Sequence, residues 1–466
     1  MMRLRSRECD AGNAAAPGLR PCPTDHAAVS ATQFKPSSNA PLTSRQHRPA
    51  MLRGWVSGGP SRPWATGASG HPATVANRQN AREMGAAMQI TVDKVKRAVK
   101  NPGMAAEVIK KKAAVQLSHR LLDGYSLAPD ELTLYLTYRC NLRCKMCDIW
   151  GESGFAYGME KDSLDQMLTF DRIKEIIDEI ADWKPKITLI GGETLLYREL
   201  YPLLEHLKRH ELRVHIITNG MLLGRYAEVM VKEELVEHFT VSVDGLPDTH
   251  DQIRGGKDIF KRALAGIRTI DKYKQQLGKD HPIININFVV STWNYHQMRD
   301  FADLMVQEGV GIGWLNFQHL QYTSADIAAQ HNRVFKQKFG TTTSQWDSFV
   351  IEDVGIDPDK LVEHMHRVKE GTYPFRLTWL PDLDDEGIKA YYSDHFNSNR
   401  RCISPWAYAA ILPSGNVSPC LQYNMGNLHE QSFKEIWNNE KYVQFRREVK
   451  KGLFPVCDRC CFLWLR

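Results

Sequence analysis

The sequence has no long apolar run, few acidic residues near its start, and no cysteine between residues 148 and 401. No stretch approaches the roughly 18 consecutive apolar residues of a membrane-spanning helix, so we expect no membrane span. Residues 1–90 hold ten Arg and one Lys against four acidic residues, a net charge of +7, which leaves about −1 for the rest. The rest therefore lacks the basic surface that nucleic-acid binding requires, and we expect no nucleic-acid partner.

The N-terminal segment, residues 1–85, is rich in Ala, Ser, Pro, Gly and Arg and has no apolar period. Such a composition cannot bury enough surface to offset its ordering entropy, which predicts a disordered tail. Arg-rich, acid-poor N-termini also occur in organelle transit peptides. A wrongly assigned start codon is the other interpretation, because Met84 and Met88 precede the first structured residues. Residues 86–130 then read as a helical lead-in.

Strand and helix patterns alternate over residues 131–320. The predicted strands are residues 132–137, 186–190, 213–218, 239–243, 283–290 and 312–317. The predicted amphipathic helices between them are residues 170–183, 200–209, 227–237, 260–276 and 295–308. Strands that alternate with helices predict an α/β fold with a parallel sheet and right-handed crossovers.

Eight of the ten cysteines fall into two groups, at residues 140–147 and 402–461. Clustered thiols favour metal ligation in a reducing compartment over disulfides, and we expect a cytoplasmic location. Cys140, Cys144 and Cys147 follow the first predicted strand with the spacing C-x3-C-x2-C. A zinc site would need a fourth ligand, yet no His or Cys occurs between Cys147 and His206. Three thiolates would instead leave one iron of a cubane open for a small molecule.

The run Tyr138-Arg-Cys-Asn-Leu-Arg-Cys-Lys-Met-Cys closely resembles the signature of the radical S-adenosylmethionine (SAM) enzymes. This resemblance implies a partial (β/α)6 TIM-like barrel with a 4Fe-4S cluster on Cys140, Cys144 and Cys147. In that family the cluster takes one electron, from a flavodoxin or ferredoxin, and cleaves bound SAM reductively. The resulting 5′-deoxyadenosyl radical then abstracts hydrogen from an unreactive C–H bond.

The same resemblance suggests SAM-binding residues. Gly191, Gly192 and Glu193 follow the second predicted strand, where the family has Gly-Gly-Glu-Pro and holds the amino group of SAM; here Thr194 replaces the proline. Asn219, at the end of the third predicted strand, is a further candidate cofactor contact. At the end of the fourth, the resemblance makes Ser242 and Asp244 candidate ribose contacts and Arg254 a candidate partner of the carboxylate. The alternative is that Ser242 and Asp244 only end a strand in a turn, and that Arg254 lies on a solvated helix start.

The second cysteine group begins with Cys402 and Cys420 in the pattern C-x12-G-x4-C and ends with Cys457, Cys460 and Cys461. Residues 407–420 predict a β-hairpin with a turn at residues 413–416. A capping box at residues 432–435 is expected to open one helix with apolar positions through residue 449. Two separated cysteine pairs are also typical of a structural zinc site, and spacing alone leaves both metals open.

This C-terminal layout resembles the auxiliary-cluster domains called SPASM and twitch. The resemblance implies a small α+β domain over residues 401–466, with a second 4Fe-4S cluster on Cys402, Cys420, Cys457 and Cys460. Cys461 is an alternative to Cys460. Because the chain ends before further cysteines, we expect the shortened, one-cluster form. Residues 321–400 would connect it to the barrel.

Together these features predict a radical SAM oxidoreductase or transferase that modifies a C–H bond of a small molecule or peptide. No separate peptide-binding domain is evident over residues 90–130, which favours a small molecule. The alternative function is a non-catalytic iron–sulfur or zinc protein on a degenerate barrel, acting in electron transfer or interaction.

Overall fold

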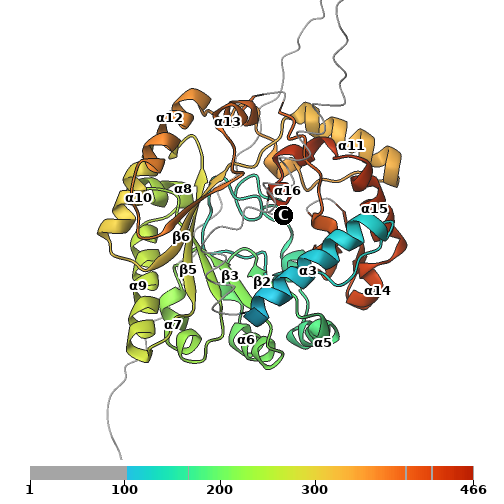
Figure 1. The fold of residues 1–466 in the computed structure, drawn as a ribbon, viewed down its shortest axis with the longest axis horizontal. Helices are drawn as coiled ribbons and strands as arrows, with labels where there is room; N and C mark the ends of the chain where they lie inside the picture. The colour runs from blue at the N-terminus through green and yellow to red at the C-terminus, as the bar shows by residue number, and fades with distance from the viewer. Residues whose placement is uncertain (1–101, 166, 394–395, 421–422, 465–466) are drawn as a thin grey trace, which may run out of the picture. The chain divides into compact units, whose positions relative to one another are not determined.

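The computed structural model describes residues 102–165, 167–393, 396–420 and 423–464. The predictions for residues 1–85 lie outside them. In Figure 1 the helices surround the strands of a single curved sheet. Among the described residues, no helix is long and apolar enough to cross a membrane.

The sheet has the order β10-β9-β8-β1-β2-β3-β4-β5-β6-β7. All neighbours from β8 to β7 are parallel, and the β8–β9 and β9–β10 pairs are antiparallel. The strands of the predicted barrel are β1 (Glu131–Tyr135), β2 (Lys186–Ile190), β3 (Val214–Thr218), β4 (His238–Ser242), β5 (Ile283–Val290) and β6 (Ile312–His319). All six predicted strands are therefore confirmed to within about two residues.

Helices on the outside connect these strands. They are α5 (Phe170–Ile180), α6 (Leu200–Arg209), α7 (Leu223–Lys232), α9 (Ile259–Leu277) and α10 (Met298–Gln307), with the short α4 (Lys161–Asp165) before them. Each of the five predicted helices has its counterpart. An additional helix, α8 (Pro247–Arg254), lies between β4 and α9.

The alternation of side chains along β5 shows which residues face the helices and which face the inside of the barrel. Ile284, Ile286 and Phe288 are fully buried on the face that the helices cover. The intervening positions, Asn285 and Asn287, project from the opposite face, because successive side chains of a strand alternate. Apolar side chains thus pack the sheet against its helices, and polar side chains line the inner face of the barrel.

Two strands extend the sheet beyond the predicted six. β7 (Arg376–Leu380) pairs in parallel with β6 and comes from the predicted connector, which also contains α11 (Ala325–Phe339), α12 (Pro358–Lys369) and α13 (Asp385–Tyr391). β8 (Tyr408–Ile411) pairs in parallel with β1. The first strand of the C-terminal hairpin is therefore also a strand of the barrel sheet. The domain boundaries given above stay a prediction.

The C-terminal region contains the predicted hairpin of β8 and β9 (Asn416–Ser418), followed by β10 (Gly426–Asn427). The capping box between Ser432 and Glu435 is present and opens α14 (Phe433–Trp437). The prediction of one continuous helix through residue 449 is wrong. The helix ends at Asn438, and the Asn439 side chain accepts a hydrogen bond from the Tyr442 amide to cap α15 (Glu440–Lys451). Asparagine favours such caps over helix interiors.

Contacts between distant segments fix this region to the barrel. The Glu179 carboxylate of α5 accepts hydrogen bonds from the amides of Phe433 and Lys434, at the start of α14. The Arg172 guanidinium of α5 donates to the carbonyl of Leu428. The lead-in helix α3 (Pro102–Leu121) precedes a loop whose Gly124 carbonyl accepts from the buried Arg446 of α15. A last short helix, α16 (Cys461–Trp464), follows the final cysteines.

Candidate active site at the cysteine loop

The first cysteine loop follows β1 and is held at the carboxyl ends of the strands by backbone hydrogen bonds. The Lys145 amide donates to the carbonyl of Ile253 in α8 over 2.9 Å. The Gly192 amide donates to Thr137 over 2.7 Å, and the Glu193 amide donates to Arg139 over 2.9 Å. The loop is thus joined to the end of β2 on one side and to α8 on the other.

Gly191 and Gly192 make this close approach possible. Gly191 has a φ of +153°, and a Cβ there would lie 2.4 Å from the Thr137 carbonyl oxygen. A Cβ on Gly192 would lie 2.2 Å from the carbonyl oxygen of Arg139. In the structure these glycines therefore serve contact between β2 and the cysteine loop. Their predicted contact with SAM stays a prediction.

The three thiols of the loop are free, and backbone amides point at two of them. The Leu142 amide lies 3.4 Å from the Cys140 sulfur, and the Trp150 amide lies 3.3 Å from the Cys147 sulfur. Burial raises the pKa of the Cys140 thiol to about 12. Ligation deprotonates a thiol outright, so bound iron would reverse that shift.

The donor chemistry of the loop tests which metal group fits it. The loop offers three thiols, Cys140, Cys144 and Cys147. Cysteine thiolates are the usual ligands of iron–sulfur clusters, whereas a structural zinc site has four protein ligands. The three thiols therefore fit a 4Fe-4S cluster that keeps one iron open.

Glu193, which follows the two glycines, is buried and already hydrogen-bonded. Its Oε1 accepts from the Thr218 hydroxyl over 2.6 Å and from the Leu195 amide over 3.0 Å, and its Oε2 accepts from the Asn219 amide over 2.8 Å. Burial raises the pKa of this carboxyl, and the three donors oppose that shift. A carboxylate offers about four lone pairs, which leaves room for one more donor.

Thr194 replaces the proline of the family pattern. Its hydroxyl donates to the carbonyl of Ile217 in β3 over 2.9 Å. The side chain therefore links the β2 loop to β3.

Arg254 joins the fourth strand to the cysteine loop. Its Nη2 lies 2.5 Å from Oδ2 of Asp244, and its Nη1 lies 3.6 Å from the Cys144 sulfur. Asp244 is fully buried, and its Oδ1 accepts from the Val289 amide over 2.8 Å. Burial alone would lower the pKa of Arg254, but the carboxylate of Asp244 raises it. The guanidinium therefore stays charged beside the thiols.

The structure brings most of the predicted SAM residues to the loop. Asn219 donates from Nδ2 to Asn141 over 2.8 Å and lies 3.9 Å from the Cys140 sulfur. Ser242 lies at the end of β4, half-buried and level with Asn287 of β5. Arg254 is not on a solvated helix surface, since its side chain is 11% exposed. The cofactor roles of these residues stay predictions.

Sequence reasoning missed Asn294 and Asp148. Asn294 is fully buried and donates to the carbonyls of Asp244 and Val289, so it holds the end of β4 beside β5. Nothing in its local sequence distinguishes it, because its partners lie elsewhere in the chain. Asp148 directly follows Cys147, and burial raises its pKa to about 6. Its position directly after the C-x3-C-x2-C motif could have marked it as a site residue.

The second cysteine group collects beside β8 and α15. Burial raises the pKa of the Cys457 thiol, and the charges of Cys460 and Cys402 add to that shift, so these three sulfurs lie near one another. Cys420 follows β9 and packs against the main core, as Cys402 and Cys457 do. Cys460 is buried and Cys461 is half-buried, and the choice between them stays open.

Comparison with known families decides the identity of this arrangement. Residues 134–305 match the radical SAM superfamily, and residues 402–461 match the SPASM iron–sulfur cluster-binding domain. The chain belongs to the radical SAM superfamily. It is a radical SAM enzyme with a C-terminal SPASM region, so the predicted family, fold class and enzyme class are confirmed.

Curated relatives cover most of the chain. It is 28% identical over 349 residues to the AdoMet-dependent heme synthase of Methanosarcina barkeri, which covers 71% of this chain and 89% of the relative. It is 30% identical over 335 residues to the pre-heme d1 synthase of Dinoroseobacter shibae, covering 70% and 76%. It is 33% identical over 336 residues to the sporulation killing factor maturation protein SkfB of Bacillus subtilis, covering 71% and 69%.

Solved structures agree with the fold. Streptococcus suis SuiB matches with a TM-score of 0.51 and 15% identity, covering 84% of this chain and 85% of SuiB. SuiB has also been solved bound to S-adenosylmethionine and, separately, to its precursor peptide SuiA. As a radical SAM enzyme with a SPASM region, this chain uses SAM, a 4Fe-4S cluster and auxiliary iron–sulfur ligation in the SPASM region.

Proposed function

We propose that this enzyme modifies an unactivated C–H bond of a small molecule, in a site enclosed by the barrel above its cysteine loop. When bound, the cluster and SAM supply a 5′-deoxyadenosyl radical that can remove hydrogen from such a bond. The observation that carries the proposal is the Cys140–Cys144–Cys147 loop beside the Arg254–Asp244 pair. We further propose that the chain works in a reducing compartment such as the cytoplasm and receives electrons from a flavodoxin or ferredoxin.

The proposed roles of the chain's own residues follow from their positions. Cys140, Cys144 and Cys147 would hold the cluster, with Glu193 accepting from the ammonium of SAM. Asp244 keeps Arg254 charged and oriented, so the guanidinium would bind the SAM carboxylate beside the open iron. Ser242 and Asn219 would contact the rest of SAM from the ends of β4 and β3.

The inner face of the sheet supports a polar substrate. The Thr378 hydroxyl of β7 donates to Oδ1 of Asn316 in β6 over 2.9 Å, and Nδ2 of Asn316 donates to Oδ1 of Asn287 in β5 over 2.7 Å. These three half-buried side chains form a continuous row across neighbouring strands. The row ends in the Asn287 Nδ2 group, a donor that can bind a substrate carboxylate or carbonyl.

The names of the relatives favour a small molecule over a peptide. Two of the three relatives described above are named for haem-type products, and their alignments extend over most of this chain. SkfB is named as a maturation protein, and SuiB has been solved with a precursor peptide, so a peptide is the competing substrate class. The polar row formed by Thr378, Asn316 and Asn287 lies inside the barrel, where it can contact a substrate that is small enough to enter.

The experiment uses reconstituted enzyme with SAM and dithionite, incubated anaerobically with a panel of iron tetrapyrroles and, separately, with leader-containing peptides. A true substrate increases 5′-deoxyadenosine formation, and deuterium at its reacting carbon appears in that product by mass spectrometry. Deuterium transfer from a tetrapyrrole or another small molecule supports the proposal. Transfer only from a peptide would replace it with peptide modification.

A further inference from the structure

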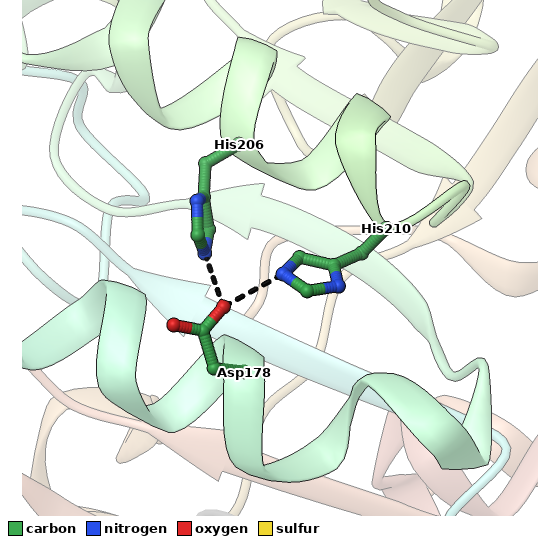
Figure 2. Close-up of side chains that lie close together, drawn as sticks. All are labelled: Asp178, His206 and His210. Atoms are coloured by element: carbon green, nitrogen blue, oxygen red, sulfur yellow. Dashed lines mark hydrogen bonds and ion pairs between the residues drawn. The ribbon is translucent and has the colours of Figure 1, made fainter.

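Asp178, His206 and His210 form a compact group on the outside of the barrel, separate from both cysteine groups. Figure 2 shows both imidazole rings aimed at the same carboxylate. Nε2 of His206 lies 2.7 Å from Oδ1 of Asp178, and Nε2 of His210 lies 2.6 Å from the same oxygen. One ligand atom from each side chain falls within a 4.8 Å group.

The backbone presents these side chains from two packed helices. His206 is in the last turn of α6 and His210 caps that helix, so the spacing i, i+4 places both rings on one side. Asp178 lies in the last turn of α5 and faces them. Two histidines one helical turn apart are a common zinc-binding arrangement, because the helix fixes their separation. A third ligand from a neighbouring rigid helix completes such a site.

His206 and His210 share one carboxylate oxygen. His206 is the more buried of the two, with 11% of its side chain exposed against 30% for His210. Each Nε2 lies within 2.7 Å of Oδ1 of Asp178, so all three ligand atoms converge on one point. A cation at that point would contact the carboxylate and both imidazoles together.

We propose that Asp178, His206 and His210 bind a zinc ion, through Oδ1 and the two Nε2 atoms, with water in the fourth position. Two imidazoles and one carboxylate are a borderline donor set that suits zinc. Zinc bonds of about 2.0–2.2 Å would place Oδ1 about 3.3 Å from each Nε2, farther than the present 2.7 and 2.6 Å. The Asp178 side chain is 53% exposed and can move outward.

Some of the surrounding charges favour a bound cation, and others oppose it. Burial would raise the pKa of Asp178, but the hydrogen bond from His210 and the charge of His206 lower it overall, so the carboxylate is ionised and ready to bind. The carboxyl end of α6 also favours a cation. Against this, Lys184 donates to the carbonyl of His210 over 2.7 Å, and Arg209 lies 3.2 Å from Nδ1 of His206.

Arg209 has a specific consequence for the proposal. As a donor to Nδ1, it favours the His206 tautomer that carries its proton on Nε2, the atom that zinc needs. Zinc binding must therefore move that proton to Nδ1 and turn Arg209 away. Replacing Arg209 with alanine should tighten zinc binding, an effect opposite to that of replacing a ligand.

The site would fix α5 to α6. The same helix α5 docks the C-terminal region, through Glu179 at the start of α14 and Arg172 at Leu428. Asp178 is the immediate neighbour of Glu179, so zinc bound there would hold the helix that carries this contact. We assign the ion a structural role, because the site lies on the outer helices and away from the cysteine loop.

The test uses the holoenzyme, whose clusters occupy the cysteines, equilibrated with buffered zinc and then desalted. We expect one zinc per chain by mass spectrometry of metals, with only nitrogen and oxygen neighbours at about 2.0–2.1 Å by X-ray absorption. His210→Ala and Asp178→Asn should lose that zinc, and Arg209→Ala should keep it with a lower dissociation constant. His366→Ala is the matched control, because His366 pairs with Asp385 over 2.8 Å and belongs to no three-ligand group among the described residues.

Thermal unfolding gives a second readout. Zinc should raise the melting temperature of the wild type and His366→Ala, because a ligand that binds only the folded state stabilises it. It should leave His210→Ala unchanged. Equal zinc content in the wild type and His210→Ala, or a zinc shell that contains sulfur, would overturn the proposal. Circular dichroism and cluster absorption confirm that each variant is folded and loaded.

Discussion

The guanidinium of Arg254 lies 3.6 Å from the sulfur of Cys144, at the end of a helix that follows the fourth strand. A permanent positive charge thus stands beside a thiol of the cysteine loop, and the buried carboxylate of Asp244 holds it there. An arginine so placed stabilises a thiolate and can bind an anionic group of a ligand at the same position. This contact ties the cysteine loop to the end of α8.

Removal of Arg254 should destabilise the enzyme through Asp244. Arg254→Ala leaves a buried carboxylate without its counter-ion, and breaking a buried pair in this way costs about 3–5 kcal/mol. Urea unfolding followed by tryptophan fluorescence measures the change. The double variant Arg254→Ala, Asp244→Asn should recover part of the loss, because the uncompensated charge is gone. Equal stability of the single and double variants would contradict this explanation.

Glu193 should control SAM affinity. A charge-assisted hydrogen bond to the ammonium of SAM is worth about 1.5–3 kcal/mol, so Glu193→Ala should weaken binding by about one to two orders of magnitude. Equilibrium dialysis with labelled SAM measures the affinity, and the absorption spectrum of the cluster should not change. Thr218→Val is the matched control, since it removes one donor to Glu193 and keeps the carboxylate. Unchanged SAM affinity in Glu193→Ala would remove this residue from the site.

The strands β1 to β6 could be predicted because each combines a short apolar pattern with a following helix. β7 was not predicted, although Arg376 to Trp379 alternate polar and apolar residues, because the strand is only five residues long and leads directly into the acidic segment after Pro381. The parallel pairing of β8 with β1 joins segments nearly 280 residues apart, as Leu132 with Ala409. Local sequence does not encode the choice of such a partner.

The candidate site, like the fold, could be predicted only where local sequence motifs mark its residues. The cysteine spacing and the Gly-Gly-Glu run supplied the candidate residues, because both are local motifs. The network around them was not evident. Thr218 and Leu195 share the Glu193 carboxylate, and Asn294 reaches back to Asp244 across 50 positions. These contacts depend on strand order and not on sequence spacing.

The auxiliary cysteines should be needed for turnover and not for SAM cleavage. A Cys457→Ala, Cys460→Ala variant should lose about half of the roughly eight irons expected for two cubanes. It should still form 5′-deoxyadenosine without substrate, because the first loop is held by separate contacts. Product formation should be lost. Circular dichroism must first show a native fold, since metal ligation can carry folding energy. A folded variant that makes no 5′-deoxyadenosine would assign electron entry to the second cluster.

Acid should destabilise the fold through His319. This imidazole is 2% exposed beside Trp379 and Tyr392, and burial lowers its pKa to about 3. The unfolded chain takes up a proton near pH 6.5. Stability is therefore complete above about pH 6.5 and falls by about 1.4 kcal/mol per pH unit for this group as the pH decreases toward 3. His319→Asn should reduce the slope of unfolding free energy between pH 6 and 4.5 by about one proton. An unchanged slope would show that His319 is protonated in the folded state.

The most direct test of radical SAM chemistry at this site is the formation of 5′-deoxyadenosine, measured by liquid chromatography under anaerobic conditions. Reconstituted wild-type enzyme should convert SAM to 5′-deoxyadenosine and methionine when dithionite is added. A variant with alanine at Cys140, Cys144 and Cys147 should form none while it keeps its auxiliary iron. Equal 5′-deoxyadenosine from both proteins, or none from fully loaded wild type, would contradict the assignment of these three cysteines as the SAM-cleaving site.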